Sequence, residues 1–358
     1  MSAATQLRQT WTIAGLQLRR VFFARRSLWV YVLALFPTAA FLTHGIDVVV
    51  TRARISQQIT ALAFLAGVRE GDTPEQVLAR ADTPIRDRTT PARTFDNGRE
   101  RPERRSMMYY DGMTRWYLYF ESGELTRKTS RVLIDLEEDR TVYAGIFQFF
   151  YLRLAIFFGC LGIFMNLFRG EMLDKTLHFW FLVPARREVL LLGKYLAGLT
   201  VSIVIFSVGA ALCYLVMLWP QEAAARAEFW PGPGLSHLLW YCAASALACV
   251  GYGSVFLAAG LLLRNPIIPT IVILFWEGLN PVLPALLQKL SVVYYVQALT
   301  PMPTPIDPGA PLLVQLFMSP AAPPSTLRAI FGLVALTAVV LWIAALSVRR
   351  LEINYSTE

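Results

Sequence analysis

The sequence predicts an all-α polytopic membrane protein with six transmembrane helices, cytoplasmic N and C termini, and a small extracytoplasmic α+β domain between helices one and two. Of its 358 residues, 55% are hydrophobic and only 16% are charged, which is far from the average composition of a soluble chain. Apolar runs long enough to cross a hydrocarbon core of about 30 Å recur along the chain. Basic residues gather between alternate pairs of these runs, the pattern of loops that stay in the cytoplasm.

The apolar runs are interpreted as helices, because they lack the alternating pattern of lipid-facing barrel strands. They cover about 28–50, 145–168, 190–219, 236–263, 267–290 and 327–348. The fifth run contains Glu277, Pro269, Pro281 and Pro284, so it either crosses fully or breaks and re-enters. The four cysteines, Cys160, Cys213, Cys242 and Cys249, all fall in predicted spans and are interpreted as small core residues.

Residues 1–27 precede the first span and include a predicted amphipathic helix at 5–26. One arc of this helix is apolar, formed by Leu7, Trp11, Ala14, Leu18, Val21 and Phe22. Arginines occupy another face. The segment therefore either lies on the membrane surface or acts only as a positive flank that orients the first span, and it does not resemble a cleavable signal peptide.

Residues 51–142 have the composition of a soluble domain and are predicted to lie outside the cytoplasm. Thr73, Pro74 and Gln76 form the pattern of a helix start, with a capping threonine, a first-position proline and a glutamine three residues on. A polar linker is expected at about 82–105. Beyond it, RWYLYF and LTRKTSRVLI read as two strands joined by the turn ESGE. The domain contains no cysteine, no histidine and no metal-ligand spacing. We therefore expect it to bind a ligand or to support the structure rather than to catalyse a reaction.

Residues 143–350 contain helices two to six. Their cytoplasmic loop at 169–189 is rich in charge, and an extracytoplasmic segment at 291–325 is broken by eight prolines. Residues 351–358 form a cytoplasmic tail. In the loop we expect a turn at Gly170 and a short two-faced helix from Glu171 to Phe181, ending before Pro184. Such a helix suits docking on a partner protein, although a solvated loop that only enforces topology is the alternative.

Residues 168–199 carry a family resemblance. This stretch resembles the membrane subunits of bacterial ABC type-2 transporters. The residues that carry the resemblance are FRGE, a Lys-Thr-Leu-His stretch, Arg186-Arg187 after Pro184, and GKYLAGL at the start of the third span. The resemblance implies a permease that pairs with a second permease, as homodimer or heterodimer, and with cytoplasmic ABC ATPase subunits. The large external domain departs from the compact polysaccharide exporters of this family, so the cargo stays open. The resemblance implies export, because most relatives export.

The resemblance also implies which residues couple to the ATPase. In this family the loop between the second and third spans fits a cleft of the ATPase, beside a connecting helix that corresponds here to residues 5–26. The ATPase-coupling role falls to Gly170, Glu171, Asp174, Lys175, Thr176, Arg186 and Arg187. The broken segment after the fifth span corresponds to external re-entrant helices.

The chain lacks an ATP site of its own. The nearest string to a P-loop, GEMLDKT from Gly170, lacks the second glycine that wraps phosphate. We therefore expect no enzyme activity, no metal and no cofactor in this chain, with ATP-Mg bound by the partner subunit. Membrane lipid is a further expected partner and nucleic acid is not. The expected location is the bacterial plasma membrane, the inner membrane if Gram-negative.

Two ionisable residues inside predicted spans are candidates for the transport path. Glu277 lies near mid-depth of the fifth span, and Arg153 lies in the second. We expect Glu277 to pair with Arg153 or a backbone donor. The alternatives are a structural polar contact between spans and an Arg153 that snorkels outward. The alternative function for the whole chain is a membrane anchor or sensor whose external domain binds a ligand or partner without transport.

Overall fold

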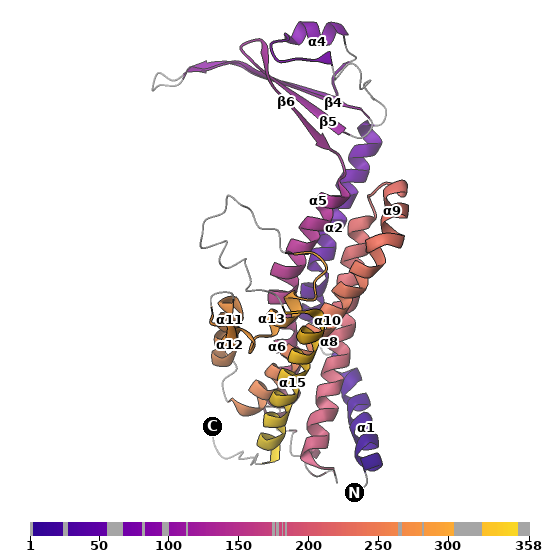
Figure 1. Cartoon of the computed structure of the whole chain (residues 1–358), viewed down its shortest axis with the longest axis vertical. Helices are drawn as coiled ribbons and strands as arrows, with labels where there is room; N and C mark the ends of the chain where they lie inside the picture. The colour runs from indigo at the N-terminus through magenta and orange to yellow at the C-terminus, as the bar shows by residue number, and fades with distance from the viewer. Residues whose placement is uncertain are drawn as a thin grey trace. The chain divides into compact units, whose positions relative to one another are not determined.

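Most of the chain is helical in a computed structural model (Figure 1). The structure describes residues 3–23, 28–55, 67–80, 83–94, 100–111, 114–173, 176, 179–180, 182, 185–263, 267–280, 283–303 and 324–349. Within these residues, five helical segments are long and apolar enough to cross a membrane. They are Leu28–Arg54, Leu136–Met172, Arg187–Leu218, Ala223–Leu262 and Thr326–Arg349. This pattern indicates a multi-pass membrane protein.

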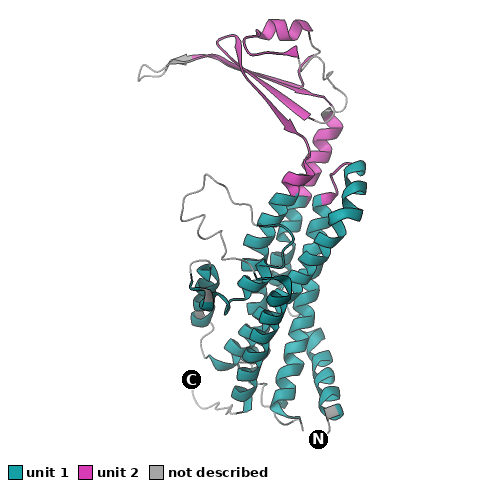
Figure 2. Ribbon diagram, in the orientation of Figure 1, with its two compact units in different colours: residues 1–41, 140–217, 223–358 teal, residues 42–139, 218–222 magenta. Residues whose placement is uncertain are grey.

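The chain divides into two compact units, which Figure 2 shows in different colours. Unit 1 comprises Met1–Phe41, Arg140–Met217 and Ala223–Glu358. Unit 2 comprises Leu42–Asp139 and Leu218–Glu222.

Unit 1 holds the apolar helices. Its N-terminal helix α1 covers Ala3–Phe22, so it begins two residues before the predicted amphipathic helix at 5–26 and ends four residues before its predicted end. Then come α2 (Leu28–Ile55), α5 (Leu136–Ile146), η2 (Phe147–Ile156), α6 (Phe157–Leu173), α8 (Arg187–Leu218), α9 (Ala223–Phe229), η3 (Trp230–Gly234), α10 (Leu235–Leu262), α11 (Ile267–Gly278), α12 (Ala285–Gln288), α13 (Val292–Gln297) and α15 (Thr326–Arg349). The first residues of α2 and the last of α5 belong to this unit, and the rest of both helices to unit 2.

The predicted fifth span is not one helix. The helix α11 has 12 residues, about 18 Å at the α-helical rise, which is too short to cross a hydrocarbon core. The chain then forms the short helices α12 and α13. The predicted break in this segment is therefore confirmed, whereas its re-entry stays a prediction. A full count of six crossings stays a prediction, because five spanning helices are found among the described residues.

Tyrosine hydroxyls tie the helices of unit 1 together. Tyr143 on α5 donates to the Ala210 carbonyl of α8 at 3.1 Å, and Tyr151 on η2 donates to Phe206 of the same helix at 2.6 Å. Tyr214 on α8 donates to the carbonyl of Gly234, just before α10, at 3.1 Å. These bonds satisfy hydroxyls that would otherwise be costly to bury in an apolar interior.

Unit 2 contains a four-stranded antiparallel sheet in the order β1-β4-β5-β6. The strands are β1 (Arg86–Thr90), β4 (Arg104–Tyr110), β5 (Thr114–Glu121) and β6 (Glu124–Val132), and a small sheet pairs β2 (Arg93–Thr94) with β3 (Glu100–Arg101). The helix α4 (Pro74–Arg80) covers one face (Figure 1). The core beneath it consists of Val68, Val77, Met107, Tyr109, Leu118, Phe120 and Leu125.

Two local predictions for this domain are confirmed. Thr73 and Gln76 bond reciprocally, from Thr73 N to Gln76 Oε1 at 3.0 Å and from Gln76 N to Thr73 Oγ at 3.4 Å, and α4 starts at Pro74. The predicted hairpin is β5–β6, with Ser122 and Gly123 in its turn at φ values of 53° and 85°. Positive φ at both turn residues matches the right-handed twist of a hairpin.

The predicted linker at 82–105 was wrong. It contains β1, β2 and β3, and β4 already begins at Arg104. Every residue of β1, RDRTT, is exposed, so this edge strand has no apolar alternation to reveal it.

Candidate functional site

The carboxylate of Glu171 lies inside unit 1, near the end of α6. The helix continues through Gly170 to Leu173, so the predicted turn at Gly170 was wrong. Glu171 is only 6% exposed and does not lie on a surface helix. An ionised carboxylate in such a place requires partners, because burial removes its hydration.

Lys194 on α8 is the main partner of Glu171. Its ammonium is fully buried, forms an ion pair with Glu171, and donates to the Leu167 carbonyl at 2.7 Å. The same ammonium lies 4.9 Å from the ring centre of Phe168 and 5.3 Å from that of Trp180. The lysine is thus held by an anion, a carbonyl and two aromatic faces.

The helix α1 also bonds to this carboxylate. Gln17 is buried and donates from Nε2 to Glu171 Oε1 at 3.0 Å. Arg20, one turn further on, places a guanidinium nitrogen 3.7 Å from the same oxygen and is largely exposed. We call Gln17, Arg20, Glu171 and Lys194 the Glu171 node. It joins α1, α6 and α8 through one side chain.

Close backbone approach supports the node. A Cβ on Gly193 would lie 2.7 Å from Ile13 Cγ2 and 3.1 Å from the Thr10 carbonyl oxygen. Ile13 packs with Val189 and Leu190 of α8, and Trp180 lies against them. Glycine at 193 therefore lets α1 lie directly against the start of α8, where the node forms.

The exit of the 169–189 loop is fixed to the end of α15. Arg187 donates to the carbonyls of Val348 at 3.4 Å and Arg349 at 3.0 Å, and Glu188 forms an ion pair with Arg349. A cation at a helix C terminus stabilises the unpaired carbonyls and the negative end of the helix dipole. Arg186 is exposed, and its carbonyl accepts from Val189 and Leu190 to begin α8.

The remaining loop residues divide between described and undescribed positions. Thr176 donates its amide to the Glu171 carbonyl at 2.9 Å. Asp174, Lys175 and Pro184 lie outside the described residues. Phe179 and Leu182 are 62% and 77% exposed, so the loop offers apolar surface that no other described part of the chain covers.

Sequence reasoning missed Gln17 and Lys194 as members of the site. Lys194 belongs to the GKYLAGL string, but its charge was counted only as a marker of topology. One signal could have indicated a buried lysine. Lys194 follows the apolar run VLLLG, directly after a glycine, and an acidic residue lies 23 positions upstream. Nothing in the sequence of Gln17 distinguishes it from a surface glutamine.

Glu277 is buried and caps α13. Its carboxylate accepts from Ser291 Oγ at 2.6 Å, Val292 N at 3.0 Å and Val293 N at 3.0 Å. These donors belong to the start of the helix, where amides have no partner within the helix. Of the two partners predicted for Glu277, the backbone donor is the one observed.

Arg153 lies in the π-helical segment η2. Its guanidinium is 5.2 Å from the ring centre of Phe149, and it interacts with Glu277 only through space. No ion pair joins the two among the described residues. Glu277 and Arg153, which were predicted as a possible pair, therefore have separate partners: the amides of α13 for Glu277 and the Phe149 ring for Arg153.

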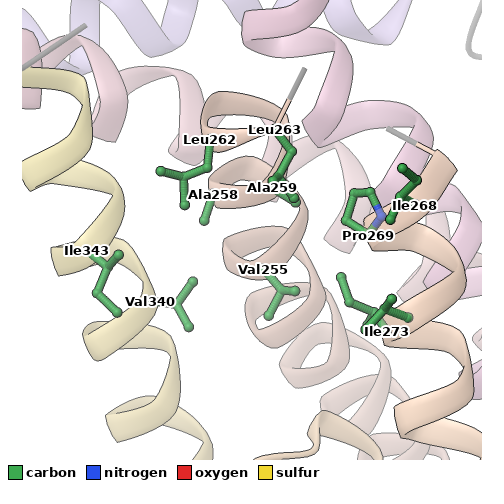
Figure 3. Close-up of a pocket in the computed structure, with 11 residues that line it drawn as sticks. Val255, Ala258, Ala259, Leu262, Leu263, Ile268, Pro269, Ile273, Val340 and Ile343 are labelled. Atoms are coloured by element: carbon green, nitrogen blue, oxygen red, sulfur yellow. The ribbon is translucent and has the colours of Figure 1, made fainter. Parts of the chain in front are cut away.

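An apolar pocket of about 570 Å³ lies between α10, α11 and α15 (Figure 3). Its eleven lining residues are Val255, Ala258, Ala259, Leu262, Leu263, Ile268, Pro269, Val272, Ile273, Val340 and Ile343. This volume is in the range of small-molecule sites, but no lining side chain can form a hydrogen bond. The pocket could hold an apolar ligand such as a hydrocarbon chain, and its lining side chains contain no polar or ionisable group that could take part in a reaction.

Within the described ranges, no group of three or more His, Cys, Asp or Glu side chains could hold a metal ion. No protein family, curated protein or solved structure matches this chain. The candidate site therefore rests on the geometry of the Glu171 node and of the loop beside it.

Proposed function

We propose that this chain is a permease subunit of an ATP-driven ABC type-2 exporter in a bacterial plasma membrane. The loop between α6 and α8 would receive a separate cytoplasmic ATPase, and a second permease would complete the membrane path. The observation that carries the proposal is the Glu171 node. One buried carboxylate joins α1, α6 and α8, so a force applied to the adjoining loop moves three helices together.

Two further observations support a docked partner at the loop. Phe179 and Leu182 expose large apolar side chains in this loop, and the ring centre of Trp180 in the same loop lies 5.3 Å from the Lys194 ammonium. Arg187 and Glu188 fix the loop exit to α15, which extends the mechanical connection to a fourth helix. A membrane anchor has no need for such a connected loop.

Purification of the tagged chain from its native membrane in mild detergent tests the proposal. We expect an ATPase subunit with a P-loop to co-purify, and its hydrolysis to respond to the permease in proteoliposomes. Replacing Phe179 and Leu182 by serine should release the ATPase without affecting membrane insertion.

Leu286 and Leu290 provide the matched control, since they are 77% and 56% exposed in another segment. Their double serine variant should retain the ATPase. Purification without any ATPase, or equal loss in both double variants, would favour the anchor or sensor over the transporter.

A further inference from the structure

One face of the sheet in unit 2 is left uncovered by α4 and carries arginine and tyrosine. Residues paired across an antiparallel sheet share a face. One row of pairs runs Arg88, Ser106, Tyr119 and Arg127 across all four strands, and the neighbouring row runs Arg86, Met108, Tyr117 and Thr129. We call Arg86, Arg88, Tyr117, Tyr119 and Arg127 the Arg–Tyr face.

The arginines of this face are accessible, and no described carboxylate pairs with them. Arg86, Arg88 and Arg127 are exposed, and none of the three makes an ion pair with another described residue. The next row contains Arg104, whose guanidinium is 2.7 Å from the Glu121 carboxylate. At the other end of the sheet Tyr110 is buried, so the accessible area ends there.

On the face covered by α4, by contrast, the charged side chains have partners within the domain. Arg105 donates to both oxygens of Asp87, at 3.1 and 2.7 Å. Lys128 turns to the Val68 carbonyl at 3.3 Å and lies 5.0 Å from the Trp116 ring centre. Charges on that face thus have partners inside the domain, whereas those on the Arg–Tyr face remain available for an external anion.

Two aromatic rings lie between the arginines. Tyr117 and Tyr119 are stacked with ring centres 6.4 Å apart and planes at 16°. Arg127 lies 6.0 Å from the Tyr119 ring centre, and Tyr119 is 39% exposed. With strands about 4.8 Å apart, the Arg88 and Arg127 backbones are separated by roughly 14 Å, with Tyr119 between them.

We propose that the Arg–Tyr face binds a linear anionic polysaccharide. Guanidinium groups pair with carboxylates in a planar fork, and the tyrosine rings present flat apolar surface to sugar rings. A chain of acidic sugars laid across the strands places its anions at the edges of the row and its rings on the tyrosines. This inference does not depend on ATPase coupling.

The expected extracytoplasmic location selects this occupant over two others. Single-stranded nucleic acid also stacks on aromatic residues of a sheet, but it belongs to the cytoplasm. Anionic phospholipid gives its strongest negative potential at the cytoplasmic leaflet. Cell-surface polysaccharide is the polyanion that an external domain meets.

Fluorescence anisotropy with labelled oligogalacturonate tests the proposal, using the full chain in nanodiscs of phosphatidylcholine. We expect saturable binding that weakens with salt, and no binding of a neutral maltooligosaccharide of equal length. The variant Arg86→Gln/Arg88→Gln/Arg127→Gln should bind about tenfold more weakly, since it loses three exposed charge contacts. The matched control, Arg54→Gln/Arg69→Gln/Arg80→Gln, removes three exposed arginines elsewhere in unit 2 and should bind normally.

A second variant separates sugar recognition from charge alone. Tyr119→Thr should weaken oligogalacturonate binding and leave inorganic polyphosphate binding unchanged. Equal loss of oligogalacturonate affinity in the two triple variants would overturn the proposal. So would polyphosphate that binds as tightly as oligogalacturonate, or a chain that binds a DNA oligonucleotide or phosphatidylglycerol vesicles more tightly than oligogalacturonate. A thermal melt of each variant confirms that the fold is intact.

Discussion

At the residue scale, the ion pair between Glu171 and Lys194 is the most consequential contact in the molecule. Lys194 is fully buried, Glu171 is only 6% exposed, and each is the main charge partner of the other. Burial of such a pair contributes little net stability, but removing one member leaves a buried charge without a partner. The pair therefore specifies how α6 and α8 pack together, and it adds little to the free energy of unfolding.

Lys194→Met should lower the free energy of unfolding by about 3–5 kcal/mol, because Glu171 loses its cation. The double variant Glu171→Gln/Lys194→Met removes both charges and should recover most of that loss. Unfolding in mixed micelles with increasing sodium dodecyl sulfate measures both values. A double variant as unstable as Lys194→Met would show that the two charges are not coupled.

Gly193→Ala should separate α1 from α8, because its new methyl group meets Ile13 at 2.7 Å. Such overpacking costs about 1–3 kcal/mol. Hydrogen exchange along α1 should increase, and Ile13→Ala should reverse part of the effect. Gly15→Ala is the matched control, since no atom lies within 4 Å of its new Cβ and the change should favour the helix. Equal exchange in the two glycine variants would contradict close packing at Gly193.

At the element scale, Glu277 determines how the broken segment after α11 is held. Its carboxylate is the acceptor for the first amides of α13, a helix of six residues that is too short to persist without packing and capping. The glutamate thus connects the short helices α11 and α13 across the break between them.

Glu277→Ala should unfold α13 locally, because each unpaired buried donor costs about 1–3 kcal/mol. Hydrogen exchange over Val292–Gln297 measures this directly. Arg153→Met is the discriminating control, and it should leave α13 protected. If Arg153→Met exposed α13 as strongly, the arginine rather than the amides would be the effective partner of Glu277.

The sheet of unit 2 should weaken in acid through one ion pair. Hydrogen bonds from Arg105 lower the pKa of Asp87. A carboxyl whose pKa is lower in the folded state stabilises the fold above its unfolded pKa of about 3.9, and this contribution is lost as pH falls through the folded pKa. Both side chains are partly exposed, so we expect less than about 1 kcal/mol.

Hydrogen exchange of β1 and β4 in the full chain, measured at each pH against Asp87→Asn, isolates this contribution. The native chain should be better protected above about pH 4, and the two should converge at lower pH as the native carboxyl is protonated. Arg80→Gln, which lies outside the pair, should follow the native curve. A constant difference at all pH values would exclude titration of Asp87.

Elements with strong local signals were predictable from the sequence. The reciprocal bonds of Thr73 and Gln76 and the turn at Ser122 and Gly123 depend on neighbours in the chain, so residue type sufficed. The edge strand β1 was missed, because its residues pack on neither face and it forms only by pairing with β4. The break after α11 was left open, because proline marks an interruption without showing where the chain turns next.

The candidate site was only half predictable. Glu171 was predicted to couple to a partner, but it was placed on a short two-faced helix of the loop rather than at the buried end of α6. Its observed partners lie 154 and 23 residues away. No local pattern encodes such contacts, since they depend on how α1 and α8 pack.

At the scale of the whole molecule, the helices of unit 1 and the sheet of unit 2 suggest different tasks. Unit 1 contains a connected set of helices with one loop whose apolar residues remain uncovered. Unit 2 contains a basic aromatic face suited to an anionic polymer. Under the proposed function, the first receives force from an ATPase, and the second binds polysaccharide outside the cell.

Photo-cross-linking from position 182 in native membranes tests the central claim most directly. A photoreactive amino acid replaces Leu182, which is 77% exposed in the loop, and in a control it replaces Val204, which is 44% exposed within α8. We predict a cross-link from position 182 to a P-loop ATPase, altered by ATP, and none from position 204. The absence of any ATPase adduct at position 182, with the chain intact in the membrane, would contradict the account.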